Sequence, residues 1–86
     1  MADGLKVSVI SAERVLFEGS ARGVVAPAFD GEMGILPMHA PLMTILGRGT
    51  LRVDTSDGEK RFAVAGGFLQ VVDDVVRVVT EQASGV

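Results

Sequence analysis

The chain has 86 residues, enough for one domain, and a formal net charge of −3 with acidic and basic residues interspersed. Apolar residues make up 48% of it, which supplies a core and argues against disorder. It has no cysteine, which excludes disulfide bonds and cysteine metal sites. It also has no tryptophan, no tyrosine and no basic stripe, which argues against nucleic-acid binding.

The N-terminal segment Met1–Lys6 has no basic region followed by an apolar one, so we do not expect a signal peptide. No apolar run approaches the roughly 20 residues that a membrane-spanning helix needs. We therefore expect an intracellular protein that does not cross a membrane, although it can work beside one.

Apolar and polar residues alternate in four stretches of the chain, which is typical of half-buried β-strands. These stretches are 5–9, 50–54, 61–64 and 76–79. Their many valines favour strands, and no segment shows the 3.6-residue period of an amphipathic helix. Eight to ten short strands at a spacing of roughly 8–12 residues predict a single all-β domain over residues 1–86, a sandwich or a flattened barrel.

Glycine, serine and aspartate clusters predict the turns between these strands. Glu18-Gly19-Ser20 and Gly47-Arg48-Gly49 are each expected to separate two strands. Asp57-Gly58 predicts a two-residue hairpin, since both residue types tolerate a positive φ, and Asp73-Asp74 is a weaker signal of the same kind. Gly66-Gly67 interrupts an apolar strand and predicts a bulge or a close approach of two backbones.

The segment Phe29–Leu42 concentrates backbone constraint and polar chemistry, since it holds glycines, prolines, two carboxylates and the single histidine. Gly31 and Gly34 predict a tight hairpin between them. Asp30 and Glu32 lie two residues apart, so in an extended segment they point the same way. Two interpretations follow from the residues alone: a solvated acidic turn, or an acidic patch that meets a basic or polar partner.

His39 has no second histidine and no cysteine beside it, so neither a zinc site nor another metal site is expected. A catalytic triad would need a serine nucleophile on a strained turn, and none is evident. We therefore predict no catalytic residue and no cofactor. A small hydrolase that uses His39 stays an alternative hypothesis for the function. Methionines 33, 38 and 43 surround the histidine, and they fit either core packing or an adaptable interface.

Two further features carry hypotheses of their own. Lys60 follows the predicted hairpin, as the modified lysine does in all-β lipoyl or biotinyl carrier domains, so a swinging-arm carrier modified on Lys60 is the alternative function. Its neighbours, Glu59 and Arg61, differ from those of the carrier domains. Val75 and Val79 fall on the outward face if Val76 and Val78 face inward, where they can form an apolar patch for a partner.

Three segments resemble one known family in both order and spacing. Phe29–Leu42 is similar to the Gly-Glu-Met/Leu-Gly-Ile-x-Pro-Gly-His-Ala-Pro-Leu loop of the epsilon subunit of bacterial F-type ATP synthase, which is the delta subunit of mitochondria. Val64–Val71 and Val9–Arg14 also resemble that family. Together they span nearly the whole chain and match the N-terminal domain of the subunit.

The resemblance implies a β-sandwich of two roughly five-stranded sheets and a non-catalytic part of the rotor stalk. Such a subunit joins the gamma subunit to the c-subunit ring in a heteromeric complex and helps to couple proton-driven rotation to ATP synthesis. It lies peripherally, on the cytoplasmic face of the bacterial inner membrane. The family's contacts map onto two sets of residues here: Asp30, Gly31 and Glu32 toward the c ring, and His39, Leu42 and Thr44 toward gamma.

This chain departs from the family pattern in two places. Met38 stands where the family usually has glycine before the histidine, so a loop that needs a positive φ there would have to differ. Most relatives continue into two C-terminal helices, whereas this sequence stops at Val86, so no C-terminal helical hairpin is expected and the inhibitory role of those helices is not carried over.

Overall fold

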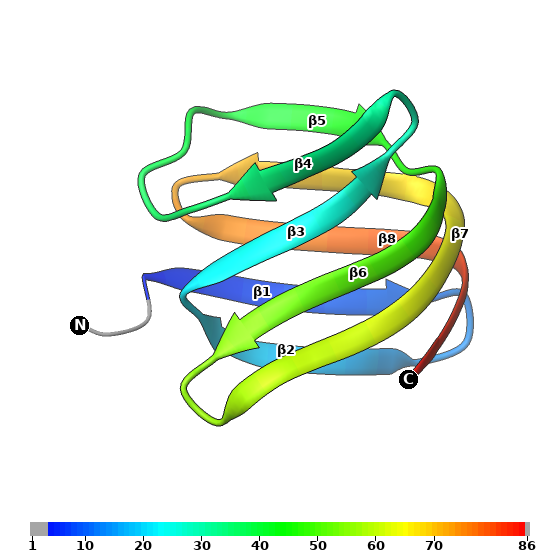
Figure 1. Cartoon of the computed structure of the whole chain (residues 1–86), viewed down its shortest axis with the longest axis horizontal. Helices are drawn as coiled ribbons and strands as arrows, with labels where there is room; N and C mark the ends of the chain where they lie inside the picture. The colour runs from blue at the N-terminus through cyan, green and yellow to red at the C-terminus, as the bar shows by residue number, and fades with distance from the viewer. Residues whose placement is uncertain (1–3, 86) are drawn as a thin grey trace.

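The computed structural model describes residues 4–85, and this part of the chain consists of strands joined by turns and short loops. The sequence-based expectation of an all-β domain is confirmed (Figure 1). The elements are β1 (Leu5–Ser11), β2 (Val15–Ala21), β3 (Gly23–Ala28), β4 (Gly31–Ile35), β5 (Leu42–Ile45), β6 (Arg48–Thr55), β7 (Gly58–Val72) and β8 (Val75–Gly85).

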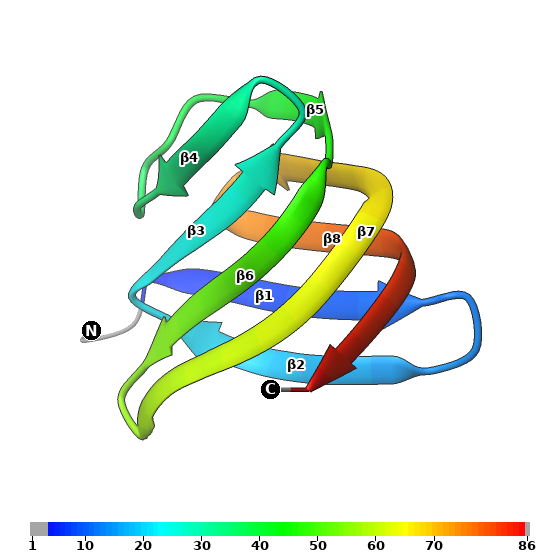
Figure 2. The ribbon, with the colours of Figure 1, turned by 45° about the vertical axis from the view of Figure 1, so that its right-hand side comes forward.

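The strands form two five-stranded layers, because the two longest strands, β7 and β8, each run through both. Residues 58–65 of β7 pair with β6, and residues 68–71 pair with β5. Residues 75–80 of β8 pair with β1, and residues 82–85 pair with the first half of β7. The first sheet therefore has the order β2-β1-β8-β7-β5 and the second β4-β3-β6-β7-β8, with the hydrogen bonding continuous between them. Figure 2 shows β7 curving from one layer into the other.

The crossing between the layers lies at Gly66 and Gly67, whose φ angles are 77° and 105°. The pairs Ala65–Gln82 and Gly67–Thr80 keep the same register on both sides of the crossing, so no extra residue is inserted. A Cβ on Gly67 would collide with the carbonyl oxygen of Val79. The glycine pair thus marks a close backbone approach, one of the two possibilities expected from the sequence, and not a bulge.

Both aspartate-containing hairpins have two-residue turns, but the one predicted at Asp57-Gly58 is shifted by one position. Asp73 and Asp74 have φ angles of 51° and 63°, and they close a turn between Val72 and Val75 in which both central residues are left-handed. In the other hairpin the central residues are Ser56 and Asp57, one position earlier than expected, and Gly58 is already the first residue of β7.

Two turn predictions were wrong. Glu18-Gly19-Ser20 lies inside β2, paired with β1. Gly19 leaves room there for the ring of Phe17, which would lie 3.3 Å from a Cβ at this position. The hairpin predicted between Gly31 and Gly34 does not form there. The turn that joins β3 to β4 consists of Phe29 and Asp30, and both glycines lie in β4.

The core lies between the two sheets and is filled by the inward positions of the alternating strands. Leu51 and Val53 are fully buried, whereas Arg52 and Asp54 between and after them reach the surface. Each such aliphatic side chain stabilises the fold by about 1.5–3 kcal/mol through burial. The largest fully buried side chains are Leu5, Ile35, Leu51, Leu69, Val9, Val24, Val53, Val71, Val76 and Val78.

Candidate functional site

The outer face of the first sheet carries a continuous row of apolar side chains that crosses five strands. Cross-strand pairs link each member to the next: Ile45 to Phe68, Phe68 to Val79, Val79 to Ile10, and Ile10 to Val15. These five residues are called the apolar row below. Neighbouring side chains on paired strands lie within contact distance of one another, so the row forms one surface.

The apolar row faces solvent. Its neighbours along the strands, Leu69, Val78 and Val9, are fully buried, so the alternation of a strand turns the row outward. Ile45 is 63% exposed and Phe68 is 38% exposed. Apolar groups that stand side by side on a surface mark a binding site more often than isolated ones do.

The outer face of the second sheet has the opposite character. Arg22 pairs with Asp54 at 3.0 Å, Arg52 approaches Glu32 at 3.3 Å, and Arg61 pairs with Glu59. All six side chains are at least one-third exposed, so these pairs hold solvated charge at the surface and add little stability. The apolar row and the three ion pairs therefore lie on opposite outer faces of the sandwich.

The loop 36–41 joins β4 to β5 and is held by the β7–β8 turn. Met38 has a φ of 69°, and its amide donates to the Oδ1 of Asp74 at 2.6 Å. The loop thus keeps the positive φ that glycine would favour, with methionine in its place. Pro37 packs against Gly4, where a Cβ would come within 2.7 Å of the proline ring. His39 is half-buried, and its Nδ1–H donates to the carbonyl oxygen of Ala40 at 2.7 Å.

The residues predicted to contact gamma do not lie on the face that carries the apolar row. Leu42 packs against the core, and Thr44 stands opposite the buried Leu69, so both occupy the inner side of β5. Met43 and Ile45, which alternate with them, point outward and are each 63% exposed. The structure therefore brings β5 to the apolar row through Ile45, a residue that the sequence analysis did not single out.

The residues predicted to contact the c ring lie at the other end of β4 from His39. Asp30 is in the β3–β4 turn, and Gly31 and Glu32 begin β4; all three are exposed. The tip and the loop lie at opposite ends of the five-residue strand β4 (Figure 1). The amide of Phe29 donates to the Ile45 carbonyl at 2.9 Å, which ties the tip to the end of β5.

The surroundings of Lys60 and His39 do not fit the alternatives considered for them. Lys60 is inside β7, paired with Val53, and not at the tip of the hairpin, where the modified lysine of a carrier domain would be displayed. Among residues 4–85, the ring of His39 has no hydrogen bond with a hydroxyl or a carboxylate, which a hydrolase acting through it would need.

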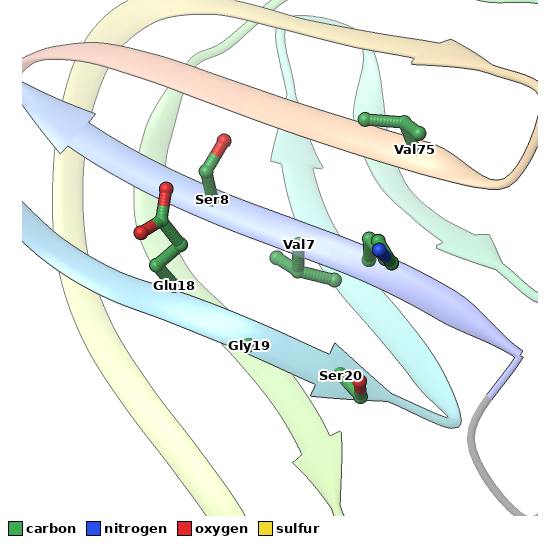
Figure 3. Close-up of a pocket in the computed structure, with 7 residues that line it drawn as sticks. Val7, Ser8, Glu18, Gly19, Ser20 and Val75 are labelled. Carbon is green, nitrogen blue, oxygen red and sulfur yellow. The ribbon is translucent and has the colours of Figure 1, made fainter.

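The outer face of the first sheet also has a shallow hollow of about 470 Å³ over β1 and β2 (Figure 3). Ser8 and Glu18 form its polar side and Val75 part of its rim, beside Lys6 and Ser20. It arises where short serine side chains follow the bulkier residues of the apolar row. Ser8 and Glu18 are direct cross-strand partners there, so the floor of the hollow carries a hydroxyl beside a carboxylate.

The described residues contain no group of three or more metal-ligating side chains placed to bind an ion. Within the same range, 4–85, no helix has the length and apolar character to span a bilayer.

The described residues thus form a two-layer β-sandwich whose outer faces differ, one carrying the apolar row and the other three ion pairs. This combination defines the class as a small all-β domain with a candidate interaction surface. Residues 4–86 match the family described as the ATP synthase delta/epsilon chain, beta-sandwich domain. The chain belongs to this family. The carrier-domain alternative for Lys60 is thereby overturned, since the whole described domain is accounted for by another family.

The curated relatives below share one name, and this chain matches only part of the length of each. The ATP synthase epsilon chain of Syntrophomonas wolfei is 44% identical over 78 residues, which are 90% of this chain and 57% of that protein. The epsilon chain of Dehalococcoides mccartyi is 46% identical over 92% of this chain and 56% of its own length. The chain therefore spans somewhat more than half the length of the curated relatives it matches.

Two solved structures share the fold. A chain in the Euglena gracilis mitochondrial ATP synthase structure, a complex that includes the c ring, superposes with a TM-score of 0.88 at 24% identity, covering 99% of this chain and 54% of that one. A chain in the Tetrahymena thermophila central stalk and c-ring structure gives a TM-score of 0.78 at 13% identity, covering 94% and 66%. At these identities the likeness concerns the fold.

Proposed function

We propose that the chain is a non-catalytic subunit of the rotor stalk of an F-type ATP synthase, joining the gamma subunit to the c-subunit ring. Through this link it helps to transmit torque between proton-driven rotation of the ring and ATP synthesis. The proposal places it peripherally at the cytoplasmic face of a bacterial inner membrane. Membership of the delta/epsilon family and the names of the relatives support it.

The observation that carries the proposal is the apolar row. A stalk subunit has to stay attached while torque passes through it, so it needs a desolvated interface core. Phe68 lies near the middle of the row, between Ile45 and Val79, and provides the large aromatic side chain typical of such a core. We assign this row to gamma, with the edge strand β5 and the loop as its border, where gamma would reach over to His39 and to Leu42 and Thr44 on the inner side of β5.

The second contact in the proposal is the acidic tip. Asp30 and Glu32 are exposed on a short, hydrogen-bonded hairpin, where carboxylates can pair with arginine or amide groups of a ring loop. Gly31, with a φ of 131°, keeps the backbone between them free of a side chain. The tip lies beside one end of the apolar row, since Phe29 of the same turn donates to the carbonyl oxygen of Ile45, so the two partners would meet the sandwich side by side.

Binding of the chain to the cognate complex of gamma with the catalytic head tests the proposal. We expect the wild-type chain to co-purify with that complex, and Phe68→Glu to weaken binding by about a hundredfold because it places a charge in the interface core. Ala63→Glu is the matched control, since Ala63 is exposed on the outer face of the second sheet. Failure of the wild-type chain to bind, or equal losses in both variants, would refute the proposal.

A further inference from the structure

Asp74 connects three segments of the chain at one end of the sandwich. It belongs to the β7–β8 turn, its backbone carbonyl accepts a hydrogen bond from the amide of Lys6 at 2.9 Å, and its Oδ1 accepts one from the amide of Met38 at 2.6 Å. One residue of a two-residue turn thereby holds both the start of β1 and the middle of the loop 36–41.

The loop depends on this contact because its own backbone is unfavourable. Met38 is in the left-handed region, which is unfavourable for a residue with a side chain. Its side chain is 90% exposed, so burial does not compensate for this cost. A charged acceptor on the Met38 amide does compensate, since hydrogen bonds to a carboxylate are stronger than those between neutral groups.

From this geometry we propose that Asp74 is a positioning residue for docking: its carboxylate holds the loop 36–41 in the conformation that presents His39 beside β5. This proposal rests on the proposed function, in which that border faces gamma. A loop that is already ordered does not lose conformational freedom on binding, so fixing it raises the affinity for the partner.

The neighbouring aspartate provides a matched control. Asp73 and Asp74 are both left-handed residues of the same turn, so replacing either by glycine preserves the backbone conformation and removes only a side chain. In the described structure it is Asp74 whose carboxylate reaches the loop. Asp74→Asn is the conservative variant, because its side-chain oxygen can still accept from the Met38 amide and asparagine tolerates a positive φ.

The first measurement is amide hydrogen exchange in the isolated chain. We expect Asp74→Gly to speed exchange at the Met38 amide by about three- to tenfold, with Asp74→Asn and Asp73→Gly close to wild type. Unchanged thermal unfolding in Asp73→Gly serves as the check that the turn tolerates glycine. If Asp74→Gly leaves exchange at Met38 unchanged, the carboxylate does not hold the loop and the proposal is overturned.

The second measurement is affinity for the gamma complex. We expect Asp74→Gly to weaken binding by about three- to tenfold, and Asp74→Asn to restore most of it. Faster exchange without any loss of affinity, while Phe68→Glu still weakens binding, would overturn the positioning role and leave the proposed function intact. Failure of the wild-type chain to bind would instead refute the proposed function, and the exchange data would still decide whether Asp74 orders the loop.

Discussion

The hydroxyl of Thr80 lies 2.9 Å from the carbonyl oxygen of Gly66, and this contact ties β8 to β7 at the point where both strands pass from one sheet to the other. The same hydroxyl lies 2.9 Å from the carbonyl oxygen of Gln82, so its single proton is shared between two acceptors. Thr80 is only 2% exposed. A buried polar side chain thus satisfies the backbone where the regular ladder is interrupted.

Thr80→Val should therefore destabilise the fold by about 1–3 kcal/mol, because valine has nearly the same shape but leaves the carbonyl oxygens of Gly66 and Gln82 without this donor. The free energy of unfolding in urea measures the change. Thr80→Ser keeps the hydroxyl and should lose clearly less. Equal losses in the two variants would show that the methyl group, and not the hydrogen bond, stabilises the crossing.

The glycine pair at the crossing gives a second prediction. Gly67→Ala should cost about 3 kcal/mol or more, because the φ of 105° is strained for alanine and the new Cβ would meet the rigid backbone of Val79 and Thr80. Gly66→Ala should cost about 1–2 kcal/mol, since there the Cβ meets the side chain of Glu81, which can move. Urea unfolding of both variants checks the order, and a larger loss for Gly66→Ala would contradict this account.

Much of the fold follows from the period-two pattern of the sequence. Alternation around Leu51 and Val53 predicts a strand with one buried face, and the structure has one there. The turns were less predictable because glycine serves several purposes. Gly19 gives room to the ring of Phe17 inside a strand, and Gly31 and Gly34 belong to β4; the sequence does not reveal which neighbour a glycine will have.

The candidate docking surface was harder to predict than the fold. The sequence places Val79 on an outward face, but the apolar row appears only when the register brings Ile45, Phe68 and Ile10 beside it from strands far apart in the chain. Met38 shows the same limitation. The positive φ expected of a glycine at that position is maintained with a methionine, and the compensating carboxylate of Asp74 lies 36 residues later.

Met38 also leads to a stability prediction. Met38→Gly should stabilise the chain by about 0.5–1 kcal/mol, because relief of the left-handed backbone outweighs the greater freedom of glycine in the unfolded state. Met43→Gly is the matched control: Met43 is similarly exposed but lies in β5, where glycine should destabilise by roughly 0.5–1 kcal/mol. Thermal unfolding measures both, and destabilisation by Met38→Gly would mean that its side chain contributes to the fold.

The two proposed contacts should differ in their response to salt. Binding of gamma through the apolar row should change by less than about threefold between roughly 0.05 M and 0.5 M salt, because uncharged surface is not screened. Binding of the c ring through Asp30 and Glu32 should weaken over the same range, and Asp30→Asn with Glu32→Gln should remove most of that dependence. Binding titrations against the isolated gamma complex and the isolated ring separate the two. A strongly salt-dependent gamma contact would move the gamma interface to the ion-paired outer face of the second sheet.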